Sequence, residues 1–292
     1  MGWAMDAVSR IERALRMAVG RADAAACPPK LADAMRHAVF PAGARVRPRL
    51  CLAVAAACGD DDPDLSDAAA ASIELLHCAS LVHDDLPCFD DAVVRRGRPS
   101  VHKAFGESLA VLAGDALIVL AFQTLARPMR APQRLALLLI TVSRSVGVPA
   151  GIVAGQAWEC ESQVDLAHYH RSKTGALFAA AAIAGAAAAG AESEPWRMFG
   201  EQLGEAYQAA DDIRDAVAEP DEIGKPVGRD LILGRPNVVT ELGLPGAIQR
   251  LEQLVGEAVA AIPPCAHAND LKALVRLEAQ RLLPKKLAQS AA

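Results

Sequence analysis

The sequence predicts an all-α fold in which residues 1–292 form a single domain. Hydrophobic residues make up 52% of the chain but aromatic residues only 4%, and alanine supplies much of the apolar content. This composition favours close-packed helices over sheets, because strands prefer β-branched and aromatic side chains. Apolar residues recur at helical spacing along the chain, and we see no strand pattern, repeat or linker.

Proline residues divide the first half of the chain into helices. The first helix is amphipathic, and its apolar face is expected to hold Val8, Ile11, Leu15 and Val19. Pro87 should end the fourth helix, because proline removes a backbone donor and clashes one turn back. Residues 88–106 are then expected to form a long functional loop. The helices expected in this half are 5–19, 30–40, 44–58, 65–86 and 107–126.

The second half is expected to continue as helices around an alanine-rich run. Asp165 suits the N-cap of a helix that carries Lys173 and Thr174 into residues 176–191. That run is too short and too weakly hydrophobic to cross a bilayer, which needs roughly 20 strongly apolar residues, so we expect no membrane span. The other expected helices are 133–146, 150–161, 194–218, 238–242, 246–262 and 268–282, with a loop over 220–236.

Charge and cysteine content exclude some classes of function. The net charge is -5 and the pI about 5.8, which gives no sign of a nucleic-acid partner. The seven cysteines are scattered without a CxxC pair, which indicates reduced thiols in a cytoplasmic protein. The N-terminus lacks the uninterrupted apolar core of a signal peptide.

Two acidic clusters are the candidate site. The first places Asp84, Asp85, Asp90 and Asp91 just before Arg95 and Arg96 in the sequence LVHDDLPCFDDAVVRRG. The second is the stretch 211–215, which reads DDIRD. Carboxylates hold Mg²⁺ through one or two contacts each and leave room for phosphate oxygens, and arginine binds phosphate in bidentate fashion. The pattern therefore predicts a site for a diphosphate that arrives with Mg²⁺.

Helix geometry decides which carboxylates can share a metal. Asp211 and Asp215 lie four residues apart and share a helix face, whereas Asp212 points about 100° away. On a continuous helix Asp84 and Asp90 would also be about 120° apart. If Pro87 ends the helix, Asp90 can fold back beside Asp84. We expect the two acidic helix ends to face each other across a cavity.

These motifs resemble those of the trans-isoprenyl diphosphate synthases, the polyprenyl synthetase family. Residues 84–90 look like the family's first aspartate-rich motif in its DDxxxxD form, and 211–215, preceded by Tyr207-Gln208, look like the second. The resemblance extends over roughly residues 30–240. It implies a bundle of ten or more helices around a central active-site cavity, a homodimer, and three Mg²⁺ ions when substrate is bound.

The resemblance also implies a role for each matching residue. The expected Mg²⁺ ligands are Asp84, Asp85, Asp90, Asp211 and Asp215. The expected ligands of the allylic diphosphate are Arg95, Lys173, Thr174, Gln208 and Lys225. The expected ligands of isopentenyl diphosphate are Arg47, His77 and Arg96. Asp84, Asp90, Arg95, Lys173 and Asp211 would act most directly in catalysis by stabilising the departing pyrophosphate.

One departure from the family pattern falls on the isopentenyl diphosphate site. The family usually reads GGKRxRP, and here residues 42–48 read AGARVRP, so that Ala44 replaces a lysine. We expect Arg45 to substitute as a ligand, or binding to be weaker. The usual GQxxD motif reads GQAWE, which ends in Glu159.

The product length depends on the residues below the first motif. Ala79 and Ser80 lie one turn deeper on the helix than Asp84, where a bulky aromatic residue in this family stops growth at fifteen carbons. Both residues are small, so we expect a C20 product, geranylgeranyl diphosphate, of the kind that feeds carotenoid synthesis. Farnesyl diphosphate, with fifteen carbons, is the alternative product.

Three other classes compete with a prenyl-elongating enzyme. A class I terpene cyclase shares the aspartates but binds no second diphosphate, which Arg47, His77 and Arg96 would hold. A non-catalytic synthase subunit typically loses an acidic motif, and both are present here. The third is a helical structural protein that binds metal incidentally. Asp115, within an apolar helix, is either a buried partner of a basic group or a residue of a dimer interface.

Overall fold

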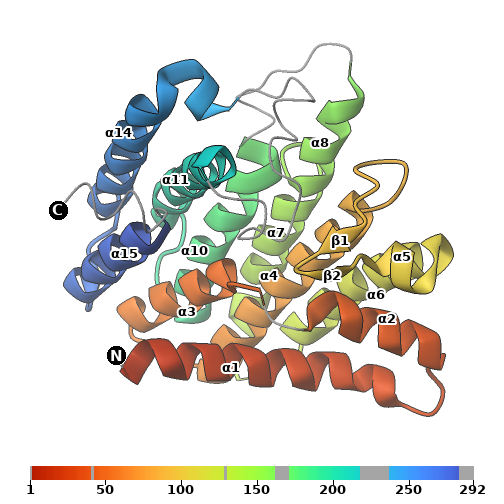
Figure 1. The fold of residues 1–292 in the computed structure, drawn as a ribbon. Helices are drawn as coiled ribbons and strands as arrows, with labels where there is room; N and C mark the ends of the chain where they lie inside the picture. Colours follow the sequence, from red (N-terminus) through yellow and green to blue (C-terminus); the bar gives the residue numbers. More distant parts are fainter. Residues whose placement is uncertain (1, 41–42, 128–129, 162–170, 218–236, 283–292) are drawn as a thin grey trace. The chain divides into compact units, whose positions relative to one another are not determined.

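The computed structural model describes residues 2–40, 43–127, 130–161, 171–217 and 237–282 (Figure 1). These residues form twelve α-helices and one two-stranded sheet, so the all-α prediction is confirmed. The chain divides into two compact units, which are described separately. Unit 1 is Met1–Ser143 with Ala184–Glu192, and unit 2 is Arg144–Ile183 with Ser193–Ala292.

Unit 1 is organised around a long helix, α4, that packs against α3 and α6 (Figure 1). The α4 helix begins at Pro63, and the side chain of Asp62 caps it by accepting a hydrogen bond from Leu65 N at 3.3 Å. Its alanine-rich middle is buried, which lets the neighbouring helices approach closely. The helices of unit 1 are α1 (Gly2–Val19), α2 (Pro29–Val39), α3 (Val46–Cys58), α4 (Pro63–Asp84), α5 (Val101–Phe105), α6 (Glu107–Leu125) and the greater part of α7 (Pro132–Val146).

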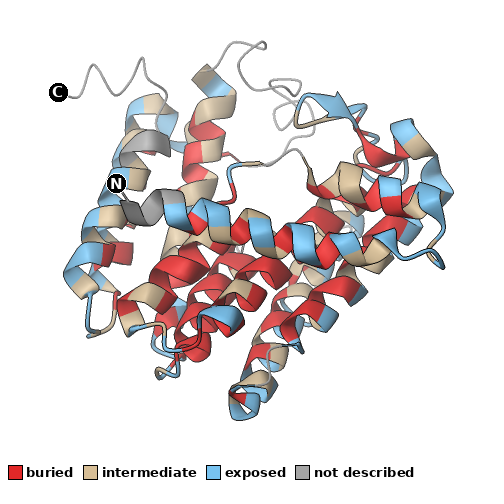
Figure 2. Ribbon diagram, turned by 90° about the horizontal axis from the view of Figure 1, so that it is seen from below, coloured by how far each residue is buried: buried red, intermediate tan, exposed pale blue. Residues whose placement is uncertain are grey.

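The α1 helix has the expected amphipathic character but a different apolar face. Ile11 and Leu15 are fully buried, as predicted, and Ala7 joins them. Val8, which was expected on the same face, is 41% exposed. Figure 2 shows buried and exposed residues alternating along the α1 helix, which begins beside the N-terminus.

The segment 88–106, predicted as one long loop, contains a hairpin and a short helix. Strands β1 (Val94–Arg95) and β2 (Arg98–Pro99) pair antiparallel. The two residues between them, Arg96 and Gly97, have φ values of 54° and 73°, as a type I′ turn requires. The sequence did not predict these strands because two-residue strands are too short to show alternation.

Unit 2 has its core between α11 and α14. The helix α14 combines two predicted helices, and its kink lies where they were expected to separate, at Gly243 with φ 67°. The helices of unit 2 are α8 (Ile152–Ala157), α11 (Trp196–Val217), α14 (Val238–Ala260) and α15 (Ala268–Leu282), and α10 (Ala176–Ala188) divides between the units. The buried core residues are Ala206, Ala209, Ala210, Ile213, Ala247, Leu251 and Leu254. Asp165 and the loop 220–236 lie outside the described residues.

Two described helices, α4 and α6, have the length and hydropathy of a membrane span. The apolar window of α4 is 78% buried within the protein, which is the behaviour of a core helix, whereas that of α6 is 44% buried. The alanine-rich run of α10 is shorter than either.

Candidate active site

The carboxyl end of α4 carries the first acidic cluster. The helix ends at Asp84, three residues before Pro87, and the chain then folds back on it. Asp90 N donates a hydrogen bond to Asp84 O at 3.0 Å, and Ala92 N donates to Asp85 O at 3.2 Å. This is the return of Asp90 to Asp84 that the sequence predicted.

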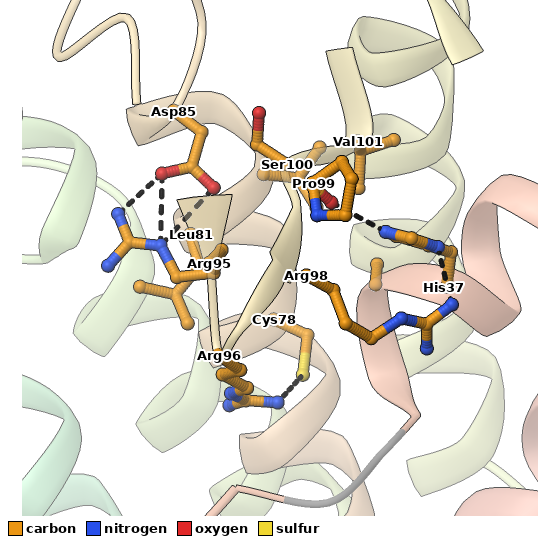
Figure 3. Close-up of a pocket in the computed structure, with 12 residues that line it drawn as sticks. His37, Cys78, Leu81, Asp85, Arg95, Arg96, Arg98, Pro99, Ser100 and Val101 are labelled. Atoms are coloured by element: carbon orange, nitrogen blue, oxygen red, sulfur yellow. Dashed lines mark hydrogen bonds and ion pairs between the residues drawn. The ribbon is translucent and has the colours of Figure 1, made fainter. Parts of the chain in front are cut away.

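Asp85 and Arg95 form an ion pair within unit 1 (Figure 3). The Arg95 Nη2 and Nε atoms lie 2.5 and 3.0 Å from Asp85 Oδ1. Burial raises the pKa of Asp85, although hydrogen bonds from Arg95 oppose that shift. These two residues were expected to contact Mg²⁺ and diphosphate, and in this arrangement each neutralises the other.

A cluster of cationic side chains lies beside this pair. Arg47 Nη1 is 3.4 Å from His77 Nε2. Burial, and then the charges of Arg47 and Arg96, hold the pKa of His77 well below its ordinary value. A neutral imidazole surrounded by guanidinium groups suits an anion, which would reduce the mutual repulsion of the arginines.

Arg45 has a different place from the one predicted. Its side chain is 2% exposed, and its nitrogens donate to Glu12 at 2.9 Å, Glu74 at 2.6 Å and Val39 O at 2.9 Å. A guanidinium that is enclosed and bonded on every side cannot substitute for the missing lysine at Ala44. Arg45 is a structural residue in this protein, which corrects the expectation that it binds substrate.

A small pocket, open to solvent, lies beside these groups. Figure 3 shows three arginines, Arg95, Arg96 and Arg98, among its walls. Cys78 also lies in the wall, but burial and the nearby Glu74 carboxylate raise the pKa of its thiol to about 12. The thiol therefore stays protonated and is no nucleophile.

The two residues expected to set product length differ in exposure. Ser80 is half-buried and its hydroxyl donates to His77 O at 2.9 Å. It lies four residues before Asp84 and therefore on the same face of α4. Ala79 is 1% exposed and packs in the core. Of the two residues, Ser80 is therefore the more accessible.

Unit 2 holds the predicted lysine and threonine in a short π-helical segment, η3 (Arg171–Gly175). Such segments are often found at functional sites. Lys173 Nζ donates to Glu159 Oε1 at 2.6 Å, and Gln156 Nε2 donates to the other oxygen of that carboxylate at 3.1 Å. Gly155 makes this possible, because a Cβ there would lie 2.6 Å from Lys173 N.

A hydrogen-bonded chain links the η3 segment to the second acidic cluster. Thr174 Oγ1 donates to Gln208 Oε1 at 3.1 Å, and Gln208 Nε2 donates to Asp212 Oδ1 at 2.9 Å. The other oxygen of Asp212 accepts from Val238 N at 3.0 Å, at the start of α14. Asp212 therefore joins α11 to the start of α14, and it is not on the face of α11 that carries the predicted metal ligands.

The remaining carboxylates suit Mg²⁺ by their chemistry. Asp211 and Asp215 lie on one face of α11, where Asp211 also bonds Arg214 at 2.8 Å. Within the described residues, no group of three His, Cys, Asp or Glu side chains is arranged to hold a metal by itself. Mg²⁺ commonly takes one or two carboxylates and completes its coordination with substrate phosphates and water. That the two acidic clusters face each other stays a prediction, and Lys225 lies outside the described residues.

Sequence reasoning missed the carboxylates that hold the cationic ligands in place. Glu159 occupies the last position of the GQxxD-like motif, which was a signal that it belongs to the site. Glu74 lies in an apolar stretch, where a single acidic residue indicated burial beside a cation. Neither residue had been assigned a role.

Comparison with known proteins places the chain among diphosphate-condensing enzymes. The family model described as polyprenyl synthetase matches residues 28–267. The geranylgeranyl diphosphate synthase of Cereibacter sphaeroides is 53% identical over 280 residues, which cover 96% of this chain and 97% of the relative. That of Rhodobacter capsulatus is 49% identical and covers 94% and 95%.

Solved structures of similar fold belong to enzymes of the same kind. The geranyltransferase of Helicobacter pylori, crystallised with magnesium and isoprenyl diphosphate, gives a TM-score of 0.80 at 28% identity over 95% of this chain and 97% of that one. The geranylgeranyl pyrophosphate synthetase of Pyrococcus horikoshii gives 0.79 at 28% identity over 94% and 96%.

Proposed function

This chain belongs to the polyprenyl synthetase family, and we propose that it condenses isopentenyl diphosphate with an allylic diphosphate to make geranylgeranyl diphosphate. The observation that carries the proposal is the cluster of Arg47, Arg96 and the neutral imidazole of His77 on α4, the helix whose carboxyl end is acidic. Such a cluster suits a second diphosphate, which a condensing enzyme binds and a terpene cyclase does not.

The proposed mechanism assigns a role to each residue that matches the family's motifs. When bound, Mg²⁺ would supply Lewis-acid stabilisation of the departing pyrophosphate. Asp84, Asp90 and Asp211 would hold it, with Asp85 and Asp215 assisting. Arg95 and Lys173 donate hydrogen bonds to the same leaving group, which stabilises developing negative charge. Thr174, Gln208 and Lys225 are proposed to complete this side.

The carbon–carbon bond then forms without a protein nucleophile. Loss of pyrophosphate leaves an allylic carbocation, and the double bond of isopentenyl diphosphate attacks it. The released pyrophosphate takes the proton that is lost. Arg47, His77 and Arg96 orient the attacking molecule, and the surrounding apolar side chains exclude water from the cation.

A C20 product is proposed because of the small residue at Ser80. A relative that is 53% identical over nearly its whole length is named for the same product, which supports the proposal. Farnesyl diphosphate is the alternative. We further propose a cytoplasmic enzyme, acting as one domain, whose product supplies carotenoid synthesis.

A homodimer is proposed from an apolar surface on unit 1. Val111, Leu112 and Val119 on α6 are 42%, 51% and 55% exposed, although they are large and hydrophobic. Asp115 lies among them, and its side chain is 60% exposed, which favours an interface position over a buried one. A second copy would cover this face.

One assay separates the competing functions. The purified protein is incubated with Mg²⁺, isopentenyl diphosphate and dimethylallyl, geranyl or farnesyl diphosphate in turn, and product length is measured. We expect a C20 diphosphate. A cyclic hydrocarbon made from the allylic substrate alone would indicate a cyclase, and no product from any primer would contradict the proposal.

A further inference from the structure

Glu74 is a buried carboxylate that faces two arginines from different segments of unit 1. Its side chain is 2% exposed and lies on α4, three residues before His77. Glu74 Oε1 accepts a hydrogen bond from Arg45 Nη1 at 2.6 Å and lies 3.6 Å from Arg96 Nη2. A carboxylate is costly to bury unless cations surround it, so these contacts account for its presence in an apolar helix.

Both arginines adopt a backbone conformation that side-chain-bearing residues rarely take. Arg45 has φ 50° at the start of α3, and Arg96 has φ 54° in the hairpin turn. A non-glycine residue in this left-handed region carries backbone strain. The conformation persists where surrounding contacts hold it, and the contact that both residues share is Glu74.

A glycine also leaves room for the Arg96 side chain. Gly43 lies against the guanidinium, and a Cβ at that position would be 2.9 Å from Arg96 Cζ and Nε. The side chain of Arg96 remains 23% exposed and lines the pocket of Figure 3, whereas that of Arg45 is enclosed. Glu74 thus forms an enclosed ion pair with Arg45, and it also lies within ion-pair distance of Arg96 at the edge of the pocket.

We propose that Glu74 is a positioning residue for the second diphosphate site. It fixes Arg96 at the hairpin turn and, through Arg45, the start of the helix that carries Arg47. The inference rests on the proposed function, because it assigns Arg47 and Arg96 to isopentenyl diphosphate. In this protein the site lacks the family's lysine at Ala44, so binding depends more heavily on the placement of these two arginines.

The test compares Glu74→Gln with Glu12→Gln. Glu12 is the second carboxylate partner of Arg45, at 2.9 Å. It is a matched control because its ion pairs in the described part of the chain are with Arg45 and Arg16 and not with Arg96. We expect Glu74→Gln to raise KM for isopentenyl diphosphate by about tenfold, while KM for the allylic diphosphate changes by less than about twofold. Glu12→Gln should lower the melting temperature but leave both KM values near those of the unmodified enzyme.

A second variant keeps the test decisive if Glu74→Gln does not fold. The double variant Glu74→Met with Arg45→Met replaces both partners of the buried pair, which is often tolerated where a single removal is not. It should fold and show the same selective rise in KM. Unchanged KM for isopentenyl diphosphate in a folded variant, or an equal rise for both substrates, would overturn the role of Glu74. An unmodified enzyme that makes no product would instead overturn the proposed function.

Discussion

The close approach of α8 to η3 allows a steric prediction with a worked magnitude. In Gly155→Ala, the new Cβ would lie 2.6 Å from Lys173 N, 2.8 Å from Lys173 Cα and 3.0 Å from Ser172 C. All three are backbone atoms, so no side-chain rotation relieves the overlap. Ordinary contact begins near 3.4 Å, and the two segments must therefore separate by about 0.8 Å. Overpacking of this kind costs about 1–3 kcal/mol.

The matched control is the same substitution where space is open. Gly256 lies on α14, and a Cβ there meets nothing within 4 Å. Gly256→Ala should therefore gain about 0.5–1 kcal/mol from helix propensity alone. The difference between the two variants isolates the overlap, because both share the propensity gain.

Two measurements check the prediction. A thermal melt should place Gly155→Ala below Gly256→Ala by about 2–4 °C for each kcal/mol of the difference. The displacement also moves Lys173, so kcat/KM for the allylic substrate should fall by about tenfold to a hundredfold in Gly155→Ala only. Equal melting temperatures and equal activity in the two variants would refute the close contact.

Three further predictions concern product length, pH and metal. Ser80→Phe should shorten the main product from C20 to C15, whereas Ala79→Phe should mainly destabilise the buried core by about 1–3 kcal/mol; an unchanged C20 product from Ser80→Phe, measured by chromatography, would show that the chain grows elsewhere. Because the folded protein holds the pKa of His77 well below 6.5, the unfolded chain takes up a proton that the folded one refuses. The free energy of unfolding should therefore decrease as the pH falls below about 6.5, by at most about 1.4 kcal/mol per pH unit from this residue. Denaturant titrations at pH 5–7 should show a smaller decrease in His77→Gln than in the unmodified protein. Removal of Mg²⁺ with a chelator should abolish turnover and re-addition should restore it; full activity in the metal-free protein would contradict the roles of Asp84 and Asp211.

The helical fold could be predicted because its signals are local. The helix end near Pro87 and the break near Gly243 follow from backbone chemistry that one residue decides. The start of α4 at Pro63 lies slightly before the residue 65 that was expected. The hairpin at 94–99 could not be predicted, since its strands have two residues each and its turn depends on Arg96 in a left-handed conformation. That conformation depends on contacts from outside the segment.

In the candidate site, too, features set by local sequence could be predicted and features set by distant contacts could not. The return of Asp90 to the end of α4 followed from the position of the proline. The direction of Arg45 did not, because the sequence gives the order of the arginines in AGARVRP but not which of them turns inward. Arg45 turns toward Glu74, which is 29 residues away in the sequence. Partners at such distances are set by packing rather than by spacing.

The pairing of Asp85 with Arg95 has a consequence for which ligands the enzyme accepts. A free phosphate that drew Arg95 out of this pair would leave a buried carboxylate without its cation, and a lone cation that drew Asp85 out would leave a guanidinium without its anion. Removing one partner of a buried pair typically costs about 3–5 kcal/mol. A ligand that brings both charges together avoids either loss. We therefore expect the pair to favour a metal-loaded diphosphate over free phosphate or the metal alone.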